Sequence, residues 1–309
     1  MILPLSRQRP ILKPATVQEL SSEGSQRRRP GGGECEILSG TDKAVILARG
    51  LGTRMRADDG GAALDAGQAR VAETGVKAMI PTMGRPFLDY VLGSLADAGF
   101  RHVCLVIGPE HTQIRNYYEN EAALSRLTVR FAEQERALGT ADAVLAAESF
   151  AGGDTFVVLN SDNYYGSAVL SELNRLEQPA MIGFERRGLI ELGNFAAERV
   201  KRFGALDIGP DGFLRRILAA PNEAMVRSGE EIYGSMNCWL FDRTIFRACR
   251  EIVPSPRGEL ELPRAVQLAI DRHGLRLKVI KVRASVLDLS SRTDIAGVEE
   301  RLRDVTLSL

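Results

Sequence analysis

Cysteine and histidine are scarce in this chain of 309 residues, and their scarcity argues against two kinds of site. The four cysteines, Cys35, Cys104, Cys238 and Cys249, show no CxxC spacing, and the three histidines are scattered. This pattern argues against a disulfide framework and against a zinc centre. We therefore expect reduced thiols, as in a cytoplasmic protein.

An excess of charge of one sign and long apolar runs are also absent. Lys plus Arg and Asp plus Glu both number 40, so the formal net charge is zero. Such a balance gives no sign of a nucleic-acid partner or of a membrane surface. No apolar run approaches the roughly 20 residues that span a bilayer, and the opening MILPLSRQRP has too short an apolar run for a signal peptide.

Residues 1–40 differ in composition from the rest of the chain. The segment SSEGSQRRRPGGGE contains Ser, Gly, Arg and Pro without an apolar period, which predicts a disordered tail. The alternative is that Arg27, Arg28 and Arg29 contact a partner or a neighbouring subunit. The remainder, 41–309, has the composition and length of a globular domain.

Short apolar strands alternate with amphipathic helices from Lys43 onward. This rhythm predicts an α/β fold with a largely parallel sheet covered on both faces. We expect Thr140 to cap its helix. The predicted strands are 44–48, 102–108, 127–133, 155–160, 180–185, 203–209, 213–219, 234–241 and 277–282, and the predicted helices are 86–100, 110–120, 140–150, 243–253, 259–273 and 293–303.

The segment AVILARGLGTRM is the first candidate binding element, because an apolar strand ends there in two glycines and a cation. Gly50 and Gly52 allow backbone N–H groups to approach phosphate oxygens, and Arg54 offers a fixed fork of donors. A third glycine at position 55 is missing, and no GK[ST] follows. The segment is therefore neither a dinucleotide fingerprint nor a P-loop.

Two carboxylates and a lysine are candidates for a magnesium–phosphate site. Asp162 follows the strand FVVLN, Asp288 follows another apolar stretch, and Lys77 lies in GVKAMIP. One or two carboxylates plus phosphate oxygens are the usual ligands of Mg²⁺ in proteins. The alternatives are that Asp162 caps the next turn and that Lys77 is an ordinary solvated lysine.

These segments occur in a recognisable order. The series LARGLGTRM, KAMIPTMGRPFLDYVL, LGTADAV, VLNSDNYYG, RGELEL and LDLSS resembles the sugar-1-phosphate nucleotidyltransferases, over about residues 43–300. The resemblance implies a Rossmann-like three-layer α/β/α fold with a mixed, mostly parallel central sheet. SDNYYG and RGELEL resemble the thymidylyltransferase branch and SMNCWLF the ADP-glucose branch. The choice among thymidylyl-, adenylyl- and uridylyltransferases therefore stays open.

The resemblance also implies a reaction of the EC 2.7.7 type. A nucleoside triphosphate and a sugar 1-phosphate would react in the presence of Mg²⁺ to give an NDP-sugar and pyrophosphate. Such a reaction belongs to sugar nucleotide biosynthesis. A homo-oligomer is compatible with this interpretation. Residues 41–180 would form the nucleotide-binding half and 181–309 the sugar-phosphate-binding half. The implied roles are catalysis for Arg54, Lys77 and Asp162; nucleotide binding for Leu47, Gly50, Gly52, Thr53, Gln134, Gly139 and Thr140; sugar-phosphate binding for Gly204, Asn237 and Glu259; and metal binding for Asp162 and Asp288.

The chain departs from this family pattern at three places. Arg49 stands where Ala is usual, as an extra cation that is either neutral or tunes base recognition. The added segment DDGGAALDAGQARVAETG is either a mobile lid or a surface excursion. Where relatives carry EKP, this chain has LAAP with Ala219 and Ala220, so the lysine for the sugar phosphate is missing.

Arg216 is the candidate that we expect to replace the missing lysine. Arg216 and Ala220 are four residues apart, and an even spacing places two residues on one face of a regular strand. Arg215 would then point to solvent. The alternative is that both arginines are solvated and that Lys77 and Mg²⁺ alone hold the phosphate.

Two other functions compete with the enzyme reading. A catalytically inactive, pyrophosphorylase-like regulatory or binding subunit is favoured by Ala219 and Ala220. It is opposed by the presence of Arg54, Lys77, Asp162 and Asp288. A nicotinamide-dependent oxidoreductase would need a third loop glycine and an acid directly after the second strand, whereas the first acid after HVCLVIG is Glu110.

Overall fold

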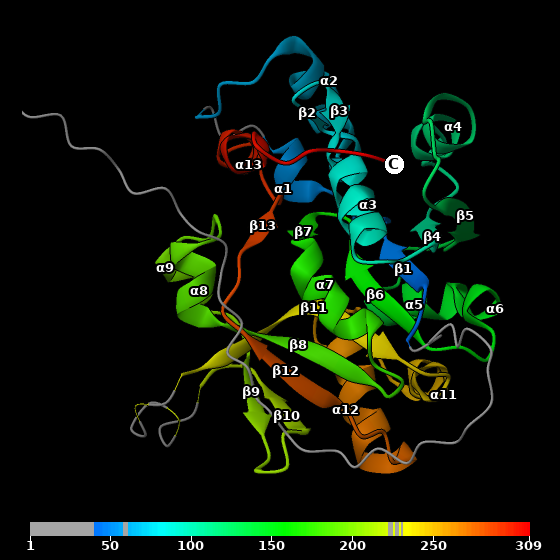
Figure 1. The fold of residues 1–309 in the computed structure, drawn as a ribbon, viewed down its shortest axis with the longest axis vertical. Helices are drawn as coiled ribbons and strands as arrows, with labels where there is room; N and C mark the ends of the chain where they lie inside the picture. The colour runs from blue at the N-terminus through cyan, green and yellow to red at the C-terminus, as the bar shows by residue number, and fades with distance from the viewer. Residues whose placement is uncertain (1–39, 58–60, 222–224, 226–228, 230) are drawn as a thin grey trace, which may run out of the picture. The chain divides into compact units, whose positions relative to one another are not determined.

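The computed structural model describes residues 40–57, 61–221, 225, 229 and 231–309 (Figure 1). The predicted tail, with Arg27 to Arg29 and Cys35, lies outside the described residues. The contacts of the chain group residues 39–309 into one unit. No helix among the described residues is long and apolar enough to cross a membrane.

Seven strands form the central sheet, in the order β12-β8-β11-β6-β1-β4-β5. Strand β11 runs antiparallel to both of its neighbours, and the other pairs are parallel. The prediction of a mixed, mostly parallel sheet is therefore confirmed. The strands are β1 (Lys43–Leu47), β4 (His102–Ile107), β5 (Thr128–Glu133), β6 (Phe156–Asn160), β8 (Ala180–Glu185), β11 (Tyr233–Phe241) and β12 (Lys278–Val282).

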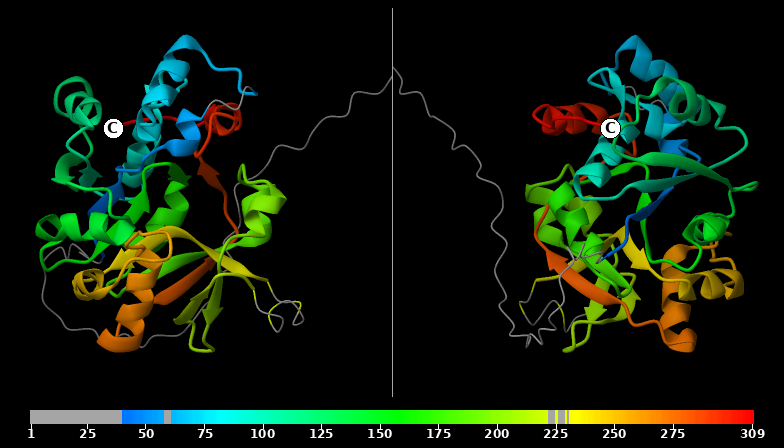
Figure 2. Two further views of the ribbon diagram at one scale, coloured as in Figure 1. Left: turned by 180° about the vertical axis from the view of Figure 1, so that it is seen from behind. Right: turned by 45° about the vertical axis from the view of Figure 1, so that its right-hand side comes forward.

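Helices cover both faces of this sheet, because its central strands are apolar on both sides. Alternate residues of β1 belong to two separate cores: Ala44 and Ile46 to one, Val45 and Leu47 to the other. The first core is covered by α2 (Ala66–Thr74), α3 (Phe87–Asp97), α7 (Ser167–Asn174) and α13 (Asp294–Leu302). The second is covered by α5 (Thr140–Ala146), α11 (Thr244–Glu251) and α12 (Leu262–His273), and Figure 2 shows α11 and α12 side by side in both views.

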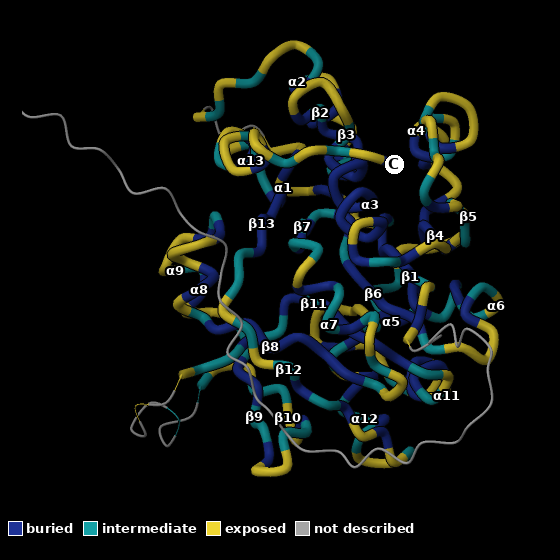
Figure 3. The backbone as a smooth tube through the Cα atoms, in the orientation of Figure 1, coloured by how far each residue is buried: buried dark blue, intermediate teal, exposed yellow. Residues whose placement is uncertain are grey.

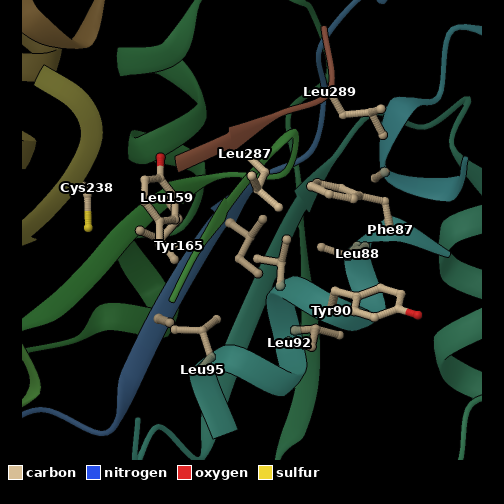
Figure 4. Close-up of a cluster of buried hydrophobic side chains, with 14 of the residues drawn as sticks. Phe87, Leu88, Tyr90, Leu92, Leu95, Leu159, Tyr165, Cys238, Leu287 and Leu289 are labelled. Atoms are coloured by element: carbon tan, nitrogen blue, oxygen red, sulfur yellow. The ribbon is translucent and has the colours of Figure 1, made fainter. Parts of the chain in front are cut away.

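Burial follows this layering. The central strands β1, β4, β6 and β8 are drawn mostly as buried in Figure 3, whereas the edge strands β5 and β12 and the outer surfaces of the helices are more exposed. Phe87 and Leu88 of α3 belong to the first core together with Leu159 of β6 and Leu287 of β13 (Figure 4). Each is at most 3% exposed, and full burial of such a side chain stabilises the fold by about 1.5–3 kcal/mol.

Shorter elements complete the fold. The strand pair β9–β10 forms a separate antiparallel ribbon, and β7–β13 forms another. These elements are α1 (Thr53–Arg56), η1 (Lys77–Met79), β2 (Pro81–Thr82), β3 (Arg85–Pro86), α4 (Thr112–Asn116), η2 (Tyr117–Glu121), α6 (Glu148–Ala151), β7 (Asn163–Tyr165), α8 (Arg186–Glu191), α9 (Ala197–Val200), β9 (Ala205–Ile208), β10 (Leu214–Leu218) and β13 (Val286–Asp288).

The helix predicted over 110–120 is wrong in its second half. Helix α4 continues there into the π-helical turn η2. Both tyrosines of this turn donate to the buried carboxylate of Asp89, Tyr117 over 2.9 Å and Tyr118 over 2.8 Å. Arg85 also pairs with Asp89, at 2.8 Å, so the buried charge is compensated. The wider turn accompanies the convergence of two adjacent tyrosines on one carboxylate.

Candidate active site

The turn after β1 is built on glycine. Gly52 has φ 60°, and a Cβ there would lie 2.0 Å from the carbonyl oxygen of Gly75. Only glycine fits so close a backbone contact. The contact holds the turn that carries Thr53 and Arg54 against the segment that leads to Lys77. The C-terminal part of the added segment folds as α2, with Val71 and Ala72 in the core.

Lys77 and Asp162 form an ion pair across this edge of the sheet. Lys77 is the first residue of η1, and its Nζ lies 2.7 Å from Oδ2 of Asp162. Both side chains are largely shielded from solvent, at 15% and 21% exposed. The two residues are 85 positions apart in the chain. The structure thus brings together two of the three residues predicted to be catalytic.

Asp288 lies next to Asp162 because β13 pairs with β7. Asp288 is opposite Asn163 in this ribbon, and Asn163 Nδ2 donates to Asp288 Oδ1 over 3.0 Å. Arg199 Nη1 lies 2.8 Å from Asp288 Oδ2. Burial, followed by the nearby charge of Asp162, raises the pKa of Asp288, and Arg199 opposes that shift.

The donor set fits a magnesium ion that is shared with substrate phosphates. A divalent cation between two neighbouring carboxylates relieves the repulsion between their charges. Within the described residues, no group of three or more His, Cys, Asp or Glu side chains could hold a metal ion on its own. The remaining ligands would therefore have to come from phosphate oxygens or water, as is usual for Mg²⁺.

A pocket of about 230 Å³ opens beside these charges, at the carboxyl ends of β1 and β6. Five of the seven residues predicted to bind nucleotide line it, together with Lys77, Asp162 and Glu259. Thr53 and Gly52 do not line it. Its walls are Leu47, Ala48, Arg49, Gly50, Leu51, Val76, Lys77, Ala78, Gln134, Ala137, Gly139, Thr140, Ala143, Asn160, Ser161, Asp162 and Glu259.

Gln134 is buried in this pocket, and two hydrogen bonds fix the orientation of its amide group. Its Nε2 donates to Gly139 O over 3.0 Å and to Asp142 Oδ2 over 2.7 Å. Both partners are acceptors, so the NH₂ group must face them. The amide oxygen of Gln134 is left to accept a hydrogen bond from a ligand.

Two distant segments form one wall of the pocket. Leu260 N donates to Leu138 O over 2.7 Å, and Ala141 N donates to Leu260 O over 2.8 Å. This pairing places Glu259 beside Gly139 and Thr140, on the wall where the resemblance places the base. The sugar-side role of Glu259 stays a prediction.

The expected cap of α5 by Thr140 is wrong. Gly139 is the N-cap residue of α5, without a side-chain cap. Thr140 Oγ1 instead accepts a hydrogen bond of 2.8 Å from Leu262 N, the first residue of α12. The hydroxyl therefore satisfies a free donor at the start of another helix.

Arg49 faces the pocket with its charge already paired. Its guanidinium contacts both carboxylate oxygens of Glu110, at 3.2 Å from Nη2, and its side chain is 9% exposed. Its Nη1 is buried without a hydrogen-bond partner. Next to Glu110, His111 Nδ1 accepts from Gly108 N over 3.1 Å, so the ring nitrogen is unprotonated there. Burial, the largest influence, lowers the pKa of His111.

The structure does not bring the other three predicted sugar-side residues into this pocket. Gly204 lies against Gly234 at the start of β11. Asn237 has φ 56° within a register shift of β11, a strained position of the kind found near functional sites. Arg216 lies on the β9–β10 ribbon and is exposed, as are Ala219 and Ala220.

The expected register of Arg215 and Arg216 is wrong as well. The prediction needed a regular strand from Arg216 to Ala220, but β10 ends at Leu218. The β9–β10 pairing also shifts between Leu214 and Arg216, which disturbs the alternation of the two arginines. Both arginines are exposed.

Sequence reasoning missed Arg199, which the structure places at the carboxylates. Arg199 and Arg54 both donate to Ser290 Oγ, over 3.0 Å and 3.4 Å. Nothing in the local sequence AERV marks this arginine, because its position depends on contacts with residues some 90 positions later in the chain.

Comparison with known proteins agrees with this geometry. The sequence model of the nucleotidyl transferase family matches residues 43–289. A bifunctional protein GlmU of Methanococcus vannielii is 29% identical over 231 residues, 74% of this chain and 47% of the relative. A glucose-1-phosphate thymidylyltransferase of Streptomyces antibioticus is 29% identical over 229 residues, 74% of this chain and 57% of the relative. The UTP–glucose-1-phosphate uridylyltransferase AglF of Haloferax volcanii is 26% identical over 268 residues, 85% of this chain and 98% of the relative.

A solved structure gives the same fold. A UDP-glucose pyrophosphorylase complexed with UDP-glucose matches with a TM-score of 0.64 at 16% identity, over 85% of this chain and 99% of the other. The three-layer nucleotidyltransferase fold expected from the sequence is thereby confirmed. The matches span 47–59% of the first four curated relatives, so those relatives contain further regions that this chain does not match.

Proposed function

The chain belongs to the nucleotidyl transferase family, and on that premise we propose that it transfers a nucleotidyl group from a nucleoside triphosphate to a sugar 1-phosphate. The products are an NDP-sugar and pyrophosphate. Relatives with 26–29% identity are named for this reaction on glucose 1-phosphate. The family match supports an enzyme of the EC 2.7.7 type.

One observation carries the proposal: two adjacent carboxylates and three cations form one connected cluster, of which Asp162 and Lys77 line the pocket. Asp162 and Asp288 interact through their charges. Lys77 and Arg199 pair with them, and Arg54 is joined to Arg199 through Ser290. Phosphoryl transfer needs such a concentration of positive groups around two anions, and it needs no covalent nucleophile.

Asp162 and Asp288 are the residues that would hold Mg²⁺. Bound there, the ion would supply Lewis-acid stabilisation of charge on the phosphates. Lys77 and Arg54 would bind the triphosphate and orient the α-phosphate for in-line attack by the sugar-phosphate oxygen. Arg54 would face the leaving pyrophosphate, and the backbone of Gly50 and Gly52 would approach the other phosphate oxygens.

The base would occupy the pocket in the 41–180 half, beside Gln134, Gly139 and Thr140. The amide oxygen of Gln134 would accept a hydrogen bond from the base edge. The sugar would lie toward the 181–309 half, near Gly204 and Asn237. Because β11 pairs with β6, the two halves share one sheet, and the substrates would meet across it.

The test is a substrate panel. The protein is incubated with each of the common nucleoside triphosphates, Mg²⁺ and a set of sugar 1-phosphates, and released pyrophosphate is measured. We expect release that requires both substrates and is abolished by EDTA. No release with any pair would contradict the proposed activity.

A binding subunit without catalysis is the second candidate, because Ala219 and Ala220 stand where the resemblance expects a lysine. The same panel separates the two functions when nucleotide binding is measured by calorimetry alongside pyrophosphate. Tight nucleotide binding without pyrophosphate release would favour the binding subunit.

A further inference from the structure

Arg199 is fixed in place from several directions. Its Nη1 contacts Asp288 and its Nη2 donates to Ser290 Oγ. Its guanidinium also lies over the ring of Phe195, 5.0 Å from the ring centre. These contacts use the three features of the guanidinium that restrict its motion: its charge, its donors and its flat face.

The segment that carries Arg199 is clamped to β13 at a second point. Asn194 Nδ2 donates to Asp288 O, and Asp288 N donates to Asn194 Oδ1, both over 2.8 Å. Phe195 packs edge-on against Phe203 with ring centres 5.3 Å apart. Residues 194–199 are therefore held on Asp288 at both ends, and Figure 1 shows α9 beside β13.

Arg199 and Arg54 converge although both are cations. Both donate to the same hydroxyl oxygen, so their guanidinium groups must lie close together. Convergence of like charges is unfavourable unless an anion binds between or beside them. Together with Lys77, these groups outnumber the carboxylates Asp162 and Asp288 by one.

Arg199 lies outside the lining of the nucleotide pocket. Asp162 and Lys77 line that pocket, whereas Asp288 and Arg199 do not. Arg199 also belongs to the half of the chain predicted to bind the sugar phosphate. An anion held by Arg199 would therefore bind next to Asp288 rather than among the residues that line the nucleotide pocket.

From this geometry we infer that Arg199 binds the phosphate of the sugar 1-phosphate, supplying the cation that Ala219 and Ala220 do not. The inference rests on the proposed function. When substrate binds, the guanidinium of Arg199 keeps its hydrogen bond to Ser290 and replaces its contact with Asp288 by one with a phosphate oxygen. Lys77 likewise replaces its contact with Asp162 by one with a phosphate oxygen. Arg216 is a poorer candidate, because it is exposed on the β9–β10 ribbon.

The decisive comparison is between Arg199→Lys and Arg199→Gln, measured with the substrate pair that the panel identifies as fastest. Lysine keeps the charge, whereas glutamine keeps a hydrogen-bond donor for Asp288 without the charge. We expect Arg199→Gln to lower kcat/KM for the sugar 1-phosphate by about 10- to 150-fold, the loss of one charge-assisted bond. Arg199→Lys should retain most of the wild-type kcat/KM for the sugar 1-phosphate. KM for the nucleoside triphosphate should stay unchanged in both variants.

Binding without divalent cation gives a readout that does not depend on turnover. Calorimetric titration in EDTA with the NDP-sugar product and with the nucleoside triphosphate should show weaker NDP-sugar binding by Arg199→Gln and unchanged triphosphate binding. Arg202→Ala, which removes an exposed arginine three residues later, is the matched control and should behave as wild type. Melting temperatures of all variants establish that they are folded.

Three results would overturn the inference while leaving the proposed function intact. The first is equal behaviour of Arg199→Gln and Arg199→Lys. The second is an equal loss for both substrates with a changed Mg²⁺ requirement, which would mean that Arg199 acts only by holding Asp288. The third is a selective loss for the sugar phosphate in Arg216→Ala instead. Absence of turnover by the wild-type protein would instead contradict the proposed function.

Discussion

The two carboxylates at the end of the sheet have unequal surroundings, although they would share one ion. Asp162 lines the pocket and pairs with Lys77, whereas Asp288 is buried and has a raised pKa. The residue types were predictable, because acids that follow apolar strands lie at the ligand-binding edge of an α/β sheet. Their partners were not, because the pairs Lys77–Asp162 and Arg199–Asp288 depend on tertiary contacts.

Asp162→Asn and Asp288→Asn should each lower turnover by about a hundredfold or more, because each removes a charge that would face Mg²⁺. Asparagine keeps the size of the side chain, so the melting temperature should change little. Rates are measured across a Mg²⁺ titration. A variant that turns over at the wild-type rate would show that its residue does not hold the metal.

Gln134→Ala should raise KM for the nucleotide more than KM for the sugar phosphate, since the amide oxygen faces the proposed base position. Asp142→Ala provides a matched comparison, because it removes the acceptor that helps to orient the amide. It should produce a smaller change in the same direction. A larger effect of Gln134→Ala on the sugar phosphate would place Gln134 on the sugar side.

Helices and strands were predictable wherever the apolar period was long and its ends were marked. Helix α3 and strand β6 lie within the predicted ranges 86–100 and 155–160. Predictions failed where a distant residue decides the local structure. The hydroxyl of Thr140 accepts a hydrogen bond from Leu262 N instead of capping its own helix. The tyrosines of η2 donate to Asp89, which lies in α3. The pairing of β10 with β9 shifts its register next to the two arginines.

Thr140→Val should lower the free energy of unfolding by about 0.5–2 kcal/mol, because the first N–H of α12 loses its acceptor. Thr140→Ser keeps the hydroxyl and should lose much less. Urea unfolding followed by circular dichroism measures both. Equal stability of the valine and serine variants would show that this hydrogen bond does not stabilise the junction of the two helices.

The loop after β4 should make stability depend on pH. The folded-state pKa of His111 is lowered by burial, the largest influence; Glu110 opposes the shift and Arg49 adds to it. The unfolded chain therefore takes up the proton first, and stability is lost as pH falls below about 6.5. As pH falls, the free energy of unfolding of the wild type should approach that of His111→Gln. Parallel curves would contradict a buried neutral imidazole.

At the scale of the whole molecule, the sequence predicts the layers and not the order of the strands. Alternating strands and helices indicate a sheet covered on both faces. The insertion of β11 between β8 and β6, with reversed direction, depends on the path of a long connection and leaves no periodic signal.

The three described cysteines offer a measure of global unfolding, because they lie in both cores. Cys238 belongs to the first core, and Cys104 and Cys249 belong to the second. All three are free and buried, and burial raises the pKa of Cys104 and of Cys249 to about 12. In a Cys35→Ser background, alkylation followed by mass spectrometry should label all three at one common rate, that of unfolding. Faster labelling of one thiol would reveal local opening at its strand or helix.

The central position of β1 has a consequence for synthesis on the ribosome. β1 is the first described strand to be made, yet its partners β4 and β6 follow later, and β6 ends about 110 residues after β1. At about 5–20 residues per second, translation needs roughly 6–20 s to deliver that second partner. Throughout this interval an apolar strand has at least one open edge, which is the condition under which nascent chains associate wrongly. The first described strand to emerge thus remains incompletely paired while more than a hundred further residues are added to the chain.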